Sequence, residues 1–272
     1  MKIYFYTSMF IFFANIPLYA IEGGPAVSKI YNLSFQKNKI GIVLDIDRTS
    51  SDFSAKESLR YAVYEVNKIK ILSAQDFKAE FPEVKKIEIF NRDYSPPDEK
   101  IEDTKGNLYK IKYSKCESPE EGDTICTKVS IKVDGKDILL DLTKDEISKS
   151  GTKIVSIERW GNQLWMGFAQ RGENSLYGDG VGVIEISSGK LIKKIYNQRS
   201  VHTALDDARP LATIIKKDPE QEVMWIGGSY GLYSYDQKIN LIHTCNLLVA
   251  YIGKDGANQT ALKDRLEFTC DK

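Results

Sequence analysis

The sequence predicts an all-β protein, specifically a β-propeller of about five four-stranded blades, with fewer or incomplete blades also compatible with its length. Short runs of β-branched and aromatic residues alternate with turn residues from Ser28 to the C-terminus, and no long stretch has helical periodicity. In addition, Glu222–Asp236 has the form strand, glycine-rich turn, strand, and a second copy spans Gln163–Ser187. Repeated units of this kind are typical of stacked blades.

The amino terminus predicts export. Lys2 precedes the apolar run Ile3–Leu18, and the small residue Ala20 closes it, which is the organisation of a secretory signal peptide. A retained membrane anchor is the alternative, but Asn15 and Pro17 interrupt the run, which is short for about 30 Å of hydrocarbon. We therefore expect residues 1–20 to be removed and residues 21–272 to form one soluble domain in the periplasm or outside the cell.

The overall charge argues against two classes of partner. Lys plus Arg equals Asp plus Glu at 38 each, so the whole molecule has no electrostatic field that would attract nucleic acid or an acidic membrane. A local patch of one sign remains compatible with this neutrality.

Most strands follow from alternation of apolar and polar residues, as in Leu108–Tyr113. Ser54–Asn67 is compatible with a helix that begins at a Ser54 capping box, but a strand is favoured because the next residues complete a hairpin. Gln75–Val84 is a short helix or a plain connection. The expected strands are Ser28–Phe35, Lys39–Asp47, Leu59–Val66, Lys68–Ser73, Lys86–Asn91, Leu108–Ser114, Thr127–Val133, Asp137–Leu142, Lys153–Arg159, Gln163–Phe168, Gly182–Ser187, Lys190–Tyr196, Ala212–Lys217, Val223–Gly227, Gly231–Tyr235, Asn240–His243 and Arg265–Cys270.

One polar segment could divide the domain. Asp93–Asp103 contains Pro96 and Pro97, which stiffen it. We interpret it as a surface loop rather than a boundary between lobes, because strands resume on both sides.

The four cysteines all lie after the predicted signal peptide, and their even number indicates disulfides in an oxidising compartment. Three pairings are possible. Proximity in the sequence favours Cys116–Cys126 and Cys245–Cys270. A zinc site is not expected, because the cysteines lack close CxxC or Cys/His spacing.

The two copies can be aligned by eye. The alignment places Trp165 on Trp225 and Gly167 on Gly227, and it treats Ala169–Gly180 as a loop inserted into the first copy. It further places Gly182 on Gly231 and Ile186 on Tyr235.

These residues resemble the two-component regulator propeller repeat, whose core reads LWIGT-x-GGL-x-x-[YF]-D. The match is Leu164–Gly167 with Gly182-Val183 in one copy, and Met224–Gly228 with Gly231–Asp236 in the other. The resemblance covers about residues 150–245. It implies a periplasmic, ligand-sensing propeller, a family whose members are often joined through a membrane helix to a histidine kinase. This chain has neither that helix after the repeats nor a kinase segment.

The repeated residues predict a structural blade core. We expect Trp165 and Trp225 to fill the gap between neighbouring sheets, and Tyr235 to help hold the ring together. Gly167, Gly227 and Gly231 are expected where the chain turns or two backbones approach closely; Trp165, Gly167, Trp225, Gly227, Gly231 and Tyr235 are the predicted core.

Few residues suggest chemistry. His202 begins a polar loop that contains Asp206 and Asp207, and this group could bind a divalent metal or relay a proton. A solvated loop is the favoured interpretation of the same residues. His243, beside Cys245, is expected to be structural.

The sequence therefore favours an exported binding module that recognises a protein, glycan or small ligand through loops such as Ala169–Gly180 and Ser200–Pro210. The alternatives are a propeller hydrolase or lyase that uses His202 with Asp206 or Asp207, and an envelope scaffold or assembly protein. Asn32 and Asn258 begin glycosylation sequons, which matter only in a eukaryote.

Overall fold

The computed structural model describes residues 28–46, 59–65, 68–84, 100–117, 125–142, 153–172, 175–195, 212–228, 231–251 and 264–271. The predicted signal peptide, the expected strand Lys86–Asn91 and most of the Asp93–Asp103 segment lie outside these residues. Within the described ranges, no helix is both long and apolar enough to cross a bilayer.

The described chain is almost entirely β-structure, organised as four antiparallel sheets that each use consecutive strands. We name them sheets A to D in chain order. Sheet A contains β1 (Ser28–Gln36), β2 (Lys39–Ile46), β3 (Leu59–Glu65) and β4 (Lys68–Leu72). Sheet B contains β5 (Lys100–Glu102), β6 (Leu108–Glu117), β7 (Ile125–Val133) and β8 (Lys136–Asp141).

The second half of the chain forms the other two sheets. Sheet C contains β9 (Lys153–Trp160), β10 (Gln163–Gly172), β11 (Ser175–Glu185) and β12 (Lys190–Ile195). Sheet D contains β13 (Ala212–Lys217), β14 (Met224–Gly228), β15 (Gly231–Tyr235), β16 (Leu241–Tyr251) and a fifth strand, β17 (Asp264–Cys270). The prediction of an all-β fold is confirmed, and so is the strand at β3.

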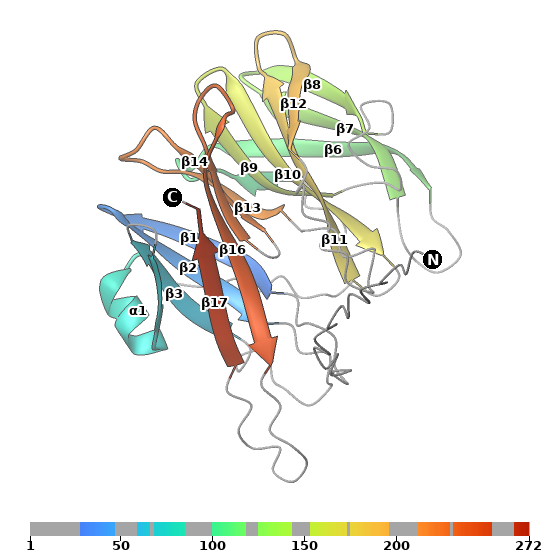
Figure 1. Cartoon of the computed structure of the whole chain (residues 1–272). Coiled ribbons are helices and arrows are strands. Elements are labelled where there is room, and N and C mark those ends of the chain that lie inside the picture. Colours follow the sequence, from blue (N-terminus) through green and yellow to red (C-terminus); the bar gives the residue numbers. More distant parts are fainter. Residues whose placement is uncertain are drawn as a thin grey trace, which may run out of the picture.

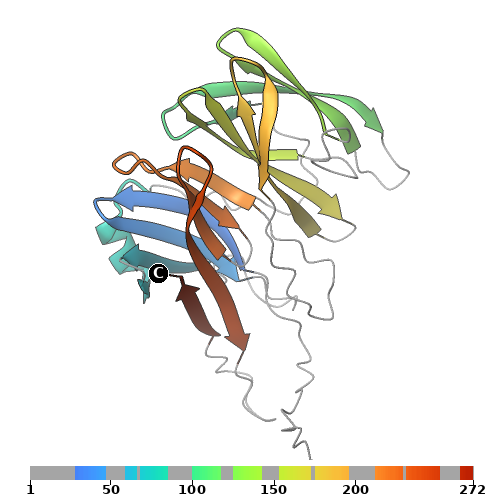
Figure 2. The ribbon, with the colours of Figure 1, turned by 45° about the horizontal axis from the view of Figure 1, so that its top comes forward.

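The sheets pack face to face in the order A, D, C, B (Figures 1 and 2). One hydrophobic cluster joins sheets B and C, a second joins C and D, and a third joins D and A. In the described part of the chain, no such cluster joins A to B. The core is therefore a succession of layers between neighbouring sheets.

The far face of sheet A is covered by the one helix of the described chain, α1 (Ala74–Glu80). Ser73 caps it, since its hydroxyl oxygen accepts from the backbone N–H of Asp76 at 3.1 Å. Phe77 and Phe81 are fully buried against the sheet. A Cβ added at Gly41 would lie 3.0 Å from both rings, so this glycine allows the helix to approach.

The far face of sheet B remains free among the described residues. Tyr109, Ile111, Ile131 and Leu140 point from this sheet into the layer shared with sheet C. Their neighbours along each strand point the other way and are mostly polar, which is the period-two pattern of a half-buried strand.

The copy in sheet C is longer than expected. Ala169–Gly180 was predicted to be an inserted loop, but strands β10 and β11 continue through it, with Ala169 opposite Gly178 and Gly172 opposite Ser175. The prediction is wrong because the residues on both sides of the turn pair with each other and lengthen the two strands. A register shift between Phe168 and Ala169 marks where this extension begins.

The register also corrects the alignment of the two copies. Trp165 lies opposite Val183, and Trp225 lies opposite Ser234. The structural counterpart of Gly231 is therefore Gly180 rather than Gly182, and that of Tyr235 is Ile184 rather than Ile186. The alignment is wrong by two residues because the sequence does not show where the long β10–β11 hairpin turns. A shift of two residues keeps each side chain on the same face of the sheet.

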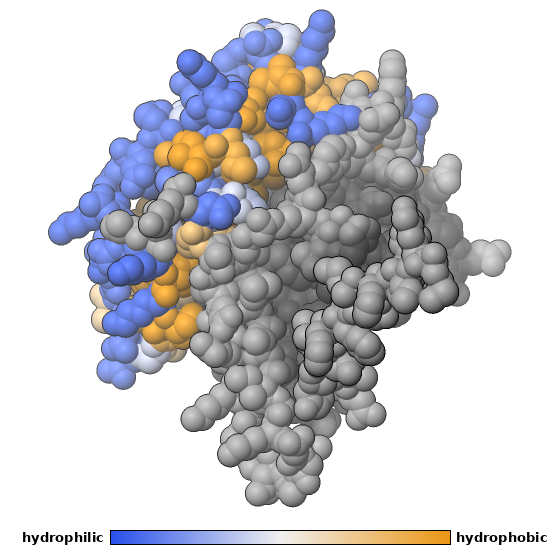
Figure 3. All heavy atoms as spheres, viewed as in Figure 1, coloured by the Kyte–Doolittle hydropathy of each residue, from blue (hydrophilic) through white to orange (hydrophobic). Residues whose placement is uncertain are grey.

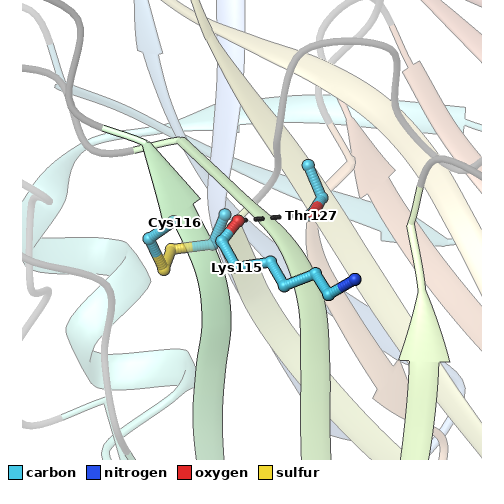
Figure 4. Close-up of a disulfide and its surroundings, with 4 residues drawn as sticks. Lys115, Cys116 and Thr127 are labelled. Carbon is cyan, nitrogen blue, oxygen red and sulfur yellow. Dashed lines mark hydrogen bonds between the residues drawn. A yellow bond between two sulfur atoms is a disulfide. The ribbon is translucent and has the colours of Figure 1, made fainter.

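Both disulfides join residues that are directly opposite each other on neighbouring strands. Cys116 pairs with Cys126 across β6 and β7, and Cys245 pairs with Cys270 across β16 and β17. Beside the first, the Thr127 hydroxyl donates to the Lys115 carbonyl at 3.3 Å (Figure 4). The second attaches the last strand to sheet D and lies in the cluster shared with sheet A.

Candidate functional site

The repeated aromatic residues lie in the layers between sheets. Trp165 is fully buried between sheets C and D, where its ring centroid is 6.0 Å from that of Tyr235. Trp225 is buried in the layer between sheets D and A, with the Tyr64 ring 5.6 Å away. The His243 ring is nearly parallel to that of Trp225, with the ring centroids 6.1 Å apart.

The repeated glycines lie at crowded positions. A Cβ at Gly227 would be 2.7 Å from Ile30 Cγ2, and one at Gly231 would be 2.7 Å from the carbonyl oxygen of Cys245. Gly167 is buried opposite Ser156. At Gly227 and Gly231, a side chain would block the approach of a neighbouring element.

The residues that suggested chemistry are not described. His202, Asp206 and Asp207 fall in residues 201–211, outside the described ranges. No cluster of three or more His, Cys, Asp or Glu suitable for a metal occurs among the described residues.

Polar side chains in or just after the first strands of the sheets make hydrogen bonds from one sheet to the next, and these were not predicted from the sequence. We call Thr104, Glu158, Lys216 and Asn32 the central polar row. Thr104, just after β5, donates to the Glu158 carboxylate from its backbone N–H at 3.1 Å and from its hydroxyl. Lys216 of β13 donates to the Asn32 side-chain oxygen at 2.8 Å and to the Leu33 carbonyl at 2.9 Å.

These contacts tie each sheet to the next. Thr104 and Glu158 link sheets B and C, and Lys216 links sheet D to sheet A. Between sheets C and D, the Ser156 hydroxyl accepts from the backbone N–H of Ile215 at 3.0 Å. The side chain of Asn32, which begins a glycosylation sequon, thus accepts a hydrogen bond from Lys216.

Burial disfavours the charged forms of Glu158 and Lys216 in this row. Burial is the main cause that raises the pKa of the Glu158 carboxyl, while the hydrogen bonds from Thr104 and the charge of Lys216 lower it. Burial likewise lowers the pKa of the Lys216 ammonium, and the charges of Glu158 and Glu83 oppose that shift. Both charged groups are hydrogen-bonded, so the row positions the sheets rather than presenting a free reactive group.

The corrected register contains the signal that could have identified this pair. Glu158 lies opposite Trp165, and Lys216 lies opposite Trp225, so the two residues hold the same position in consecutive sheets. In the sequence, each is a charged residue that follows two isoleucines on its strand, Ile154 and Ile157 before Glu158 and Ile214 and Ile215 before Lys216.

The free face of sheet B carries several exposed lysines close together. Lys100, Lys110 and Lys132 are successive cross-strand partners, so three ammonium groups share one row. Lys112 lies two residues along β6 on the same face, and Lys128 lies two rows away from Lys132. We call these five residues the lysine face. Lys100, Lys110, Lys112 and Lys132 are exposed.

Carboxylates on this face balance only part of its charge. Asp141 pairs with Lys128 at 3.4 Å, Asp137 lies opposite Lys132, and Glu102 lies beside the β5–β6 turn. Within the described chain, the ammonium groups of Lys110 and Lys112, whose side chains are exposed, make no hydrogen bond or ion pair. Like charges directly opposite each other are unfavourable in a sheet, and Asp137 offsets the charge only at the Lys132 end of this row.

Two exposed aliphatic residues of the described chain, Leu108 and Leu139, lie on the lysine face, in register with Lys110 and Lys112, and the others lie on sheets A, C and D. Figure 3 shows hydrophobic surface interrupted by hydrophilic side chains over the described part of one side of the molecule. The large exposed aliphatic residues are Ile71, Leu108, Leu139, Ile192, Leu241 and Ile242.

A short pattern in sheet D could suggest a hydrolase, but its context is different. Gly227–Gly231 reads GGSYG, which fits G-x-S-x-G. In α/β-hydrolases the serine of this motif lies between a strand and a helix. Here the segment joins β14 to β15, two antiparallel strands of one hairpin. The pattern therefore lacks the context that its chemistry needs.

Fold and surface together define an all-β protein with two disulfides and a lysine-rich terminal sheet. The sequence matches no family model and no curated protein.

Proposed function

We propose that the protein is an exported, propeller-type binding module, with sheets A to D as its blades and no catalytic role. The predicted signal peptide and the two disulfides support an oxidising location, the periplasm or the extracellular space. The repeated blade cores and the central polar row, which holds the first strands together, support the propeller-type arrangement.

The observation that carries the binding role is the row Lys100, Lys110 and Lys132. Strands are about 4.8 Å apart and alternate residues of a strand about 6.8 Å apart, so the lysine face presents cations at regular short spacings. An extended polymer with closely spaced anions complements such a face. We infer that the ligand is an acidic polysaccharide, because polymers of this class occur where an exported protein is found.

The binding test compares two triple variants of the mature chain, residues 21–272. Polygalacturonate is the acidic probe, and dextran is the neutral one. The variant Lys110→Gln/Lys112→Gln/Lys132→Gln should bind polygalacturonate at least ~10-fold more weakly, about 1.4 kcal/mol. The control Lys70→Gln/Lys78→Gln/Lys193→Gln, which removes three exposed lysines elsewhere, should bind as the wild type does.

The same variants separate ligand class from mere charge. Binding should weaken as salt rises, because the cations are exposed. Equal binding of both triple variants, or equal binding of dextran and polygalacturonate, would contradict the proposal. Binding of polyphosphate without polygalacturonate would retain an anion site but reject the polysaccharide. Recovery of a mature chain in the secreted fraction, with its amino terminus near Ile21, tests export separately.

A further inference from the structure

Three buried polar atoms lie in one cross-strand row of sheet D without hydrogen-bond partners in the described part of the chain. They are Trp225 Nε1, Ser234 Oγ and His243 Nδ1. Trp225 lies opposite Ser234, and Ser234 lies opposite His243, on strands β14, β15 and β16. The three side chains therefore share one face of the sheet.

This row faces the layer between sheets D and A, and the other side of that layer offers little to satisfy it. Trp225 belongs to the hydrophobic cluster there, together with Leu232 and Cys245 of the same sheet. The buried residues of sheet A in this cluster are apolar apart from Tyr64, whose ring lies 5.6 Å from that of Trp225 at a steep angle. Buried polar groups are nearly always hydrogen-bonded, so three neighbouring exceptions need an explanation.

The equivalent row of sheet C shows how the fold satisfies the same position. Trp165 Nε1 donates to the Gln163 side chain at 3.1 Å. In sheet D, the residue two before the tryptophan is Val223, which has no polar side chain. Sheet C has Val183 where sheet D has Ser234. Sheet D has thus lost the acceptor for its indole and has a hydroxyl in place of an apolar group.

The hydrogen-bonding capacity of the three atoms indicates what kind of molecule could bind them. The indole N–H only donates, the serine hydroxyl donates and accepts, and an imidazole nitrogen does either according to its tautomer. The parallel rings of Trp225 and His243 stand on β14 and β16, with the small Ser234 on β15 between these strands. A water molecule satisfies about three such partners, whereas a larger ligand would have to displace this packing.

We propose that sheet D binds one internal water molecule that bridges Trp225 Nε1, Ser234 Oγ and His243 Nδ1. The water accepts from the indole and hydrogen-bonds the other two groups. It does in sheet D what the Gln163 side chain does in sheet C. This site is independent of the lysine face, so it stands or fails separately from the binding function.

Water cross-relaxation in the NMR spectrum of the mature chain, with ¹⁵N-labelled tryptophan, provides the test. The chain has three tryptophans, and Trp160 and Trp165 donate to Glu222 and Gln163. Only the Trp225 indole proton should show a cross-peak to long-lived water. Trp160→Phe and Trp225→Phe assign the three signals.

A variant that copies sheet C gives the second readout. Val223→Gln should supply the missing acceptor and abolish the water cross-peak of Trp225, whereas the control Val223→Leu should retain it. Absence of a water cross-peak at Trp225 in the wild-type chain would overturn the proposal. So would an unchanged cross-peak in a folded Val223→Gln protein. If Val223→Gln does not fold, the wild-type spectrum alone decides.

Discussion

Glu158 and Lys216 occupy the same position in consecutive sheets, each directly opposite the buried tryptophan of the next strand. Each uses its charge to hold an element of a different sheet: Glu158 binds Thr104, and Lys216 binds Asn32 and the Leu33 carbonyl. One repeated position therefore carries opposite charges in two neighbouring copies, and both serve to connect the sheets.

The stability of the protein should carry a pH dependence that comes from Glu158. Its pKa is raised in the folded state, chiefly by burial, so the folded chain holds this proton at a higher pH than the unfolded chain does. The contribution of Glu158 to stability is therefore fully present at low pH and is lost as pH rises from about 4.5, its ordinary value, through the folded pKa. Each unit of raised pKa corresponds to about 1.4 kcal/mol.

Urea unfolding of wild type and Glu158→Gln from pH 4 upward measures this effect as a difference between the two proteins. The wild type should lose stability relative to the variant as pH rises. Lys216→Met should extend the loss of stability to higher pH, because the lysine charge lowers the folded-state pKa of Glu158. If the difference in unfolding free energy between wild type and Glu158→Gln did not change with pH, the raised pKa of Glu158 would be contradicted.

Removing the Trp165 ring should be among the most damaging substitutions. Trp165 is fully buried between sheets C and D, so Trp165→Ala leaves a large cavity and should lower the free energy of unfolding by about 3–5 kcal/mol. Denaturant unfolding followed by circular dichroism measures the loss. Ile192→Ala, at an exposed site of sheet C, should cost less than about 0.5 kcal/mol. Equal losses would show that the layer is not tightly packed.

Two glycine substitutions should differ because one is crowded and the other is open. Gly227→Ala places a Cβ 2.7 Å from Ile30 and 2.8 Å from Ile214, so overpacking should cost about 1–3 kcal/mol or more. Gly135 has a φ of 79° but no atom within 4 Å of an added Cβ. Gly135→Ala should therefore cost only the backbone strain of about 1–2 kcal/mol. Calorimetry of both variants should rank Gly227→Ala as the less stable.

Loss of the second disulfide should be more damaging than loss of the first. The cysteine pairs are 10 and 25 residues apart, so loop entropy alone predicts about 3 kcal/mol for each, with the longer loop slightly ahead. Each disulfide has one buried cysteine, Cys126 or Cys245, but among the described residues only the second disulfide lies in a hydrophobic layer between two sheets, D and A. Cys245→Ala/Cys270→Ala should lower the unfolding temperature further than Cys116→Ala/Cys126→Ala. The reverse order would refute the structural role given to β17.

Three local elements, two strands and a helix, show where the sequence was sufficient to predict secondary structure. Alternation along Leu108–Tyr113 predicted a strand with one buried face, and the chain forms it. Leu59–Glu65 carried a competing helical signal, yet the hairpin that follows correctly favoured a strand. The sequence of Gln75–Val84 is compatible with a short helix or a plain connection, and the chain forms a helix at Ala74–Glu80 with Ser73 as its cap.

Other features could not be read from local pattern. The extended hairpin of β10 and β11 depends on which residues pair, and pairing is a property of two strands rather than of either one. For the same reason, the alignment of Gly182 with Gly231 was wrong by two residues. The lysine row was invisible because Lys100, Lys110 and Lys132 are neighbours only across strands.

The sequence by itself determined the β class of this protein, the short strands and turns, and the residues Trp165 and Trp225 that repeat from one sheet to another. Periodicity and turn chemistry are local, so they are written in consecutive residues. Only the tertiary structure decided the order of the sheets, the central polar row and the unpaired atoms beside Trp225. These depend on register and on which sheet faces which, and a layer between sheets exists only once distant parts of the chain have packed together.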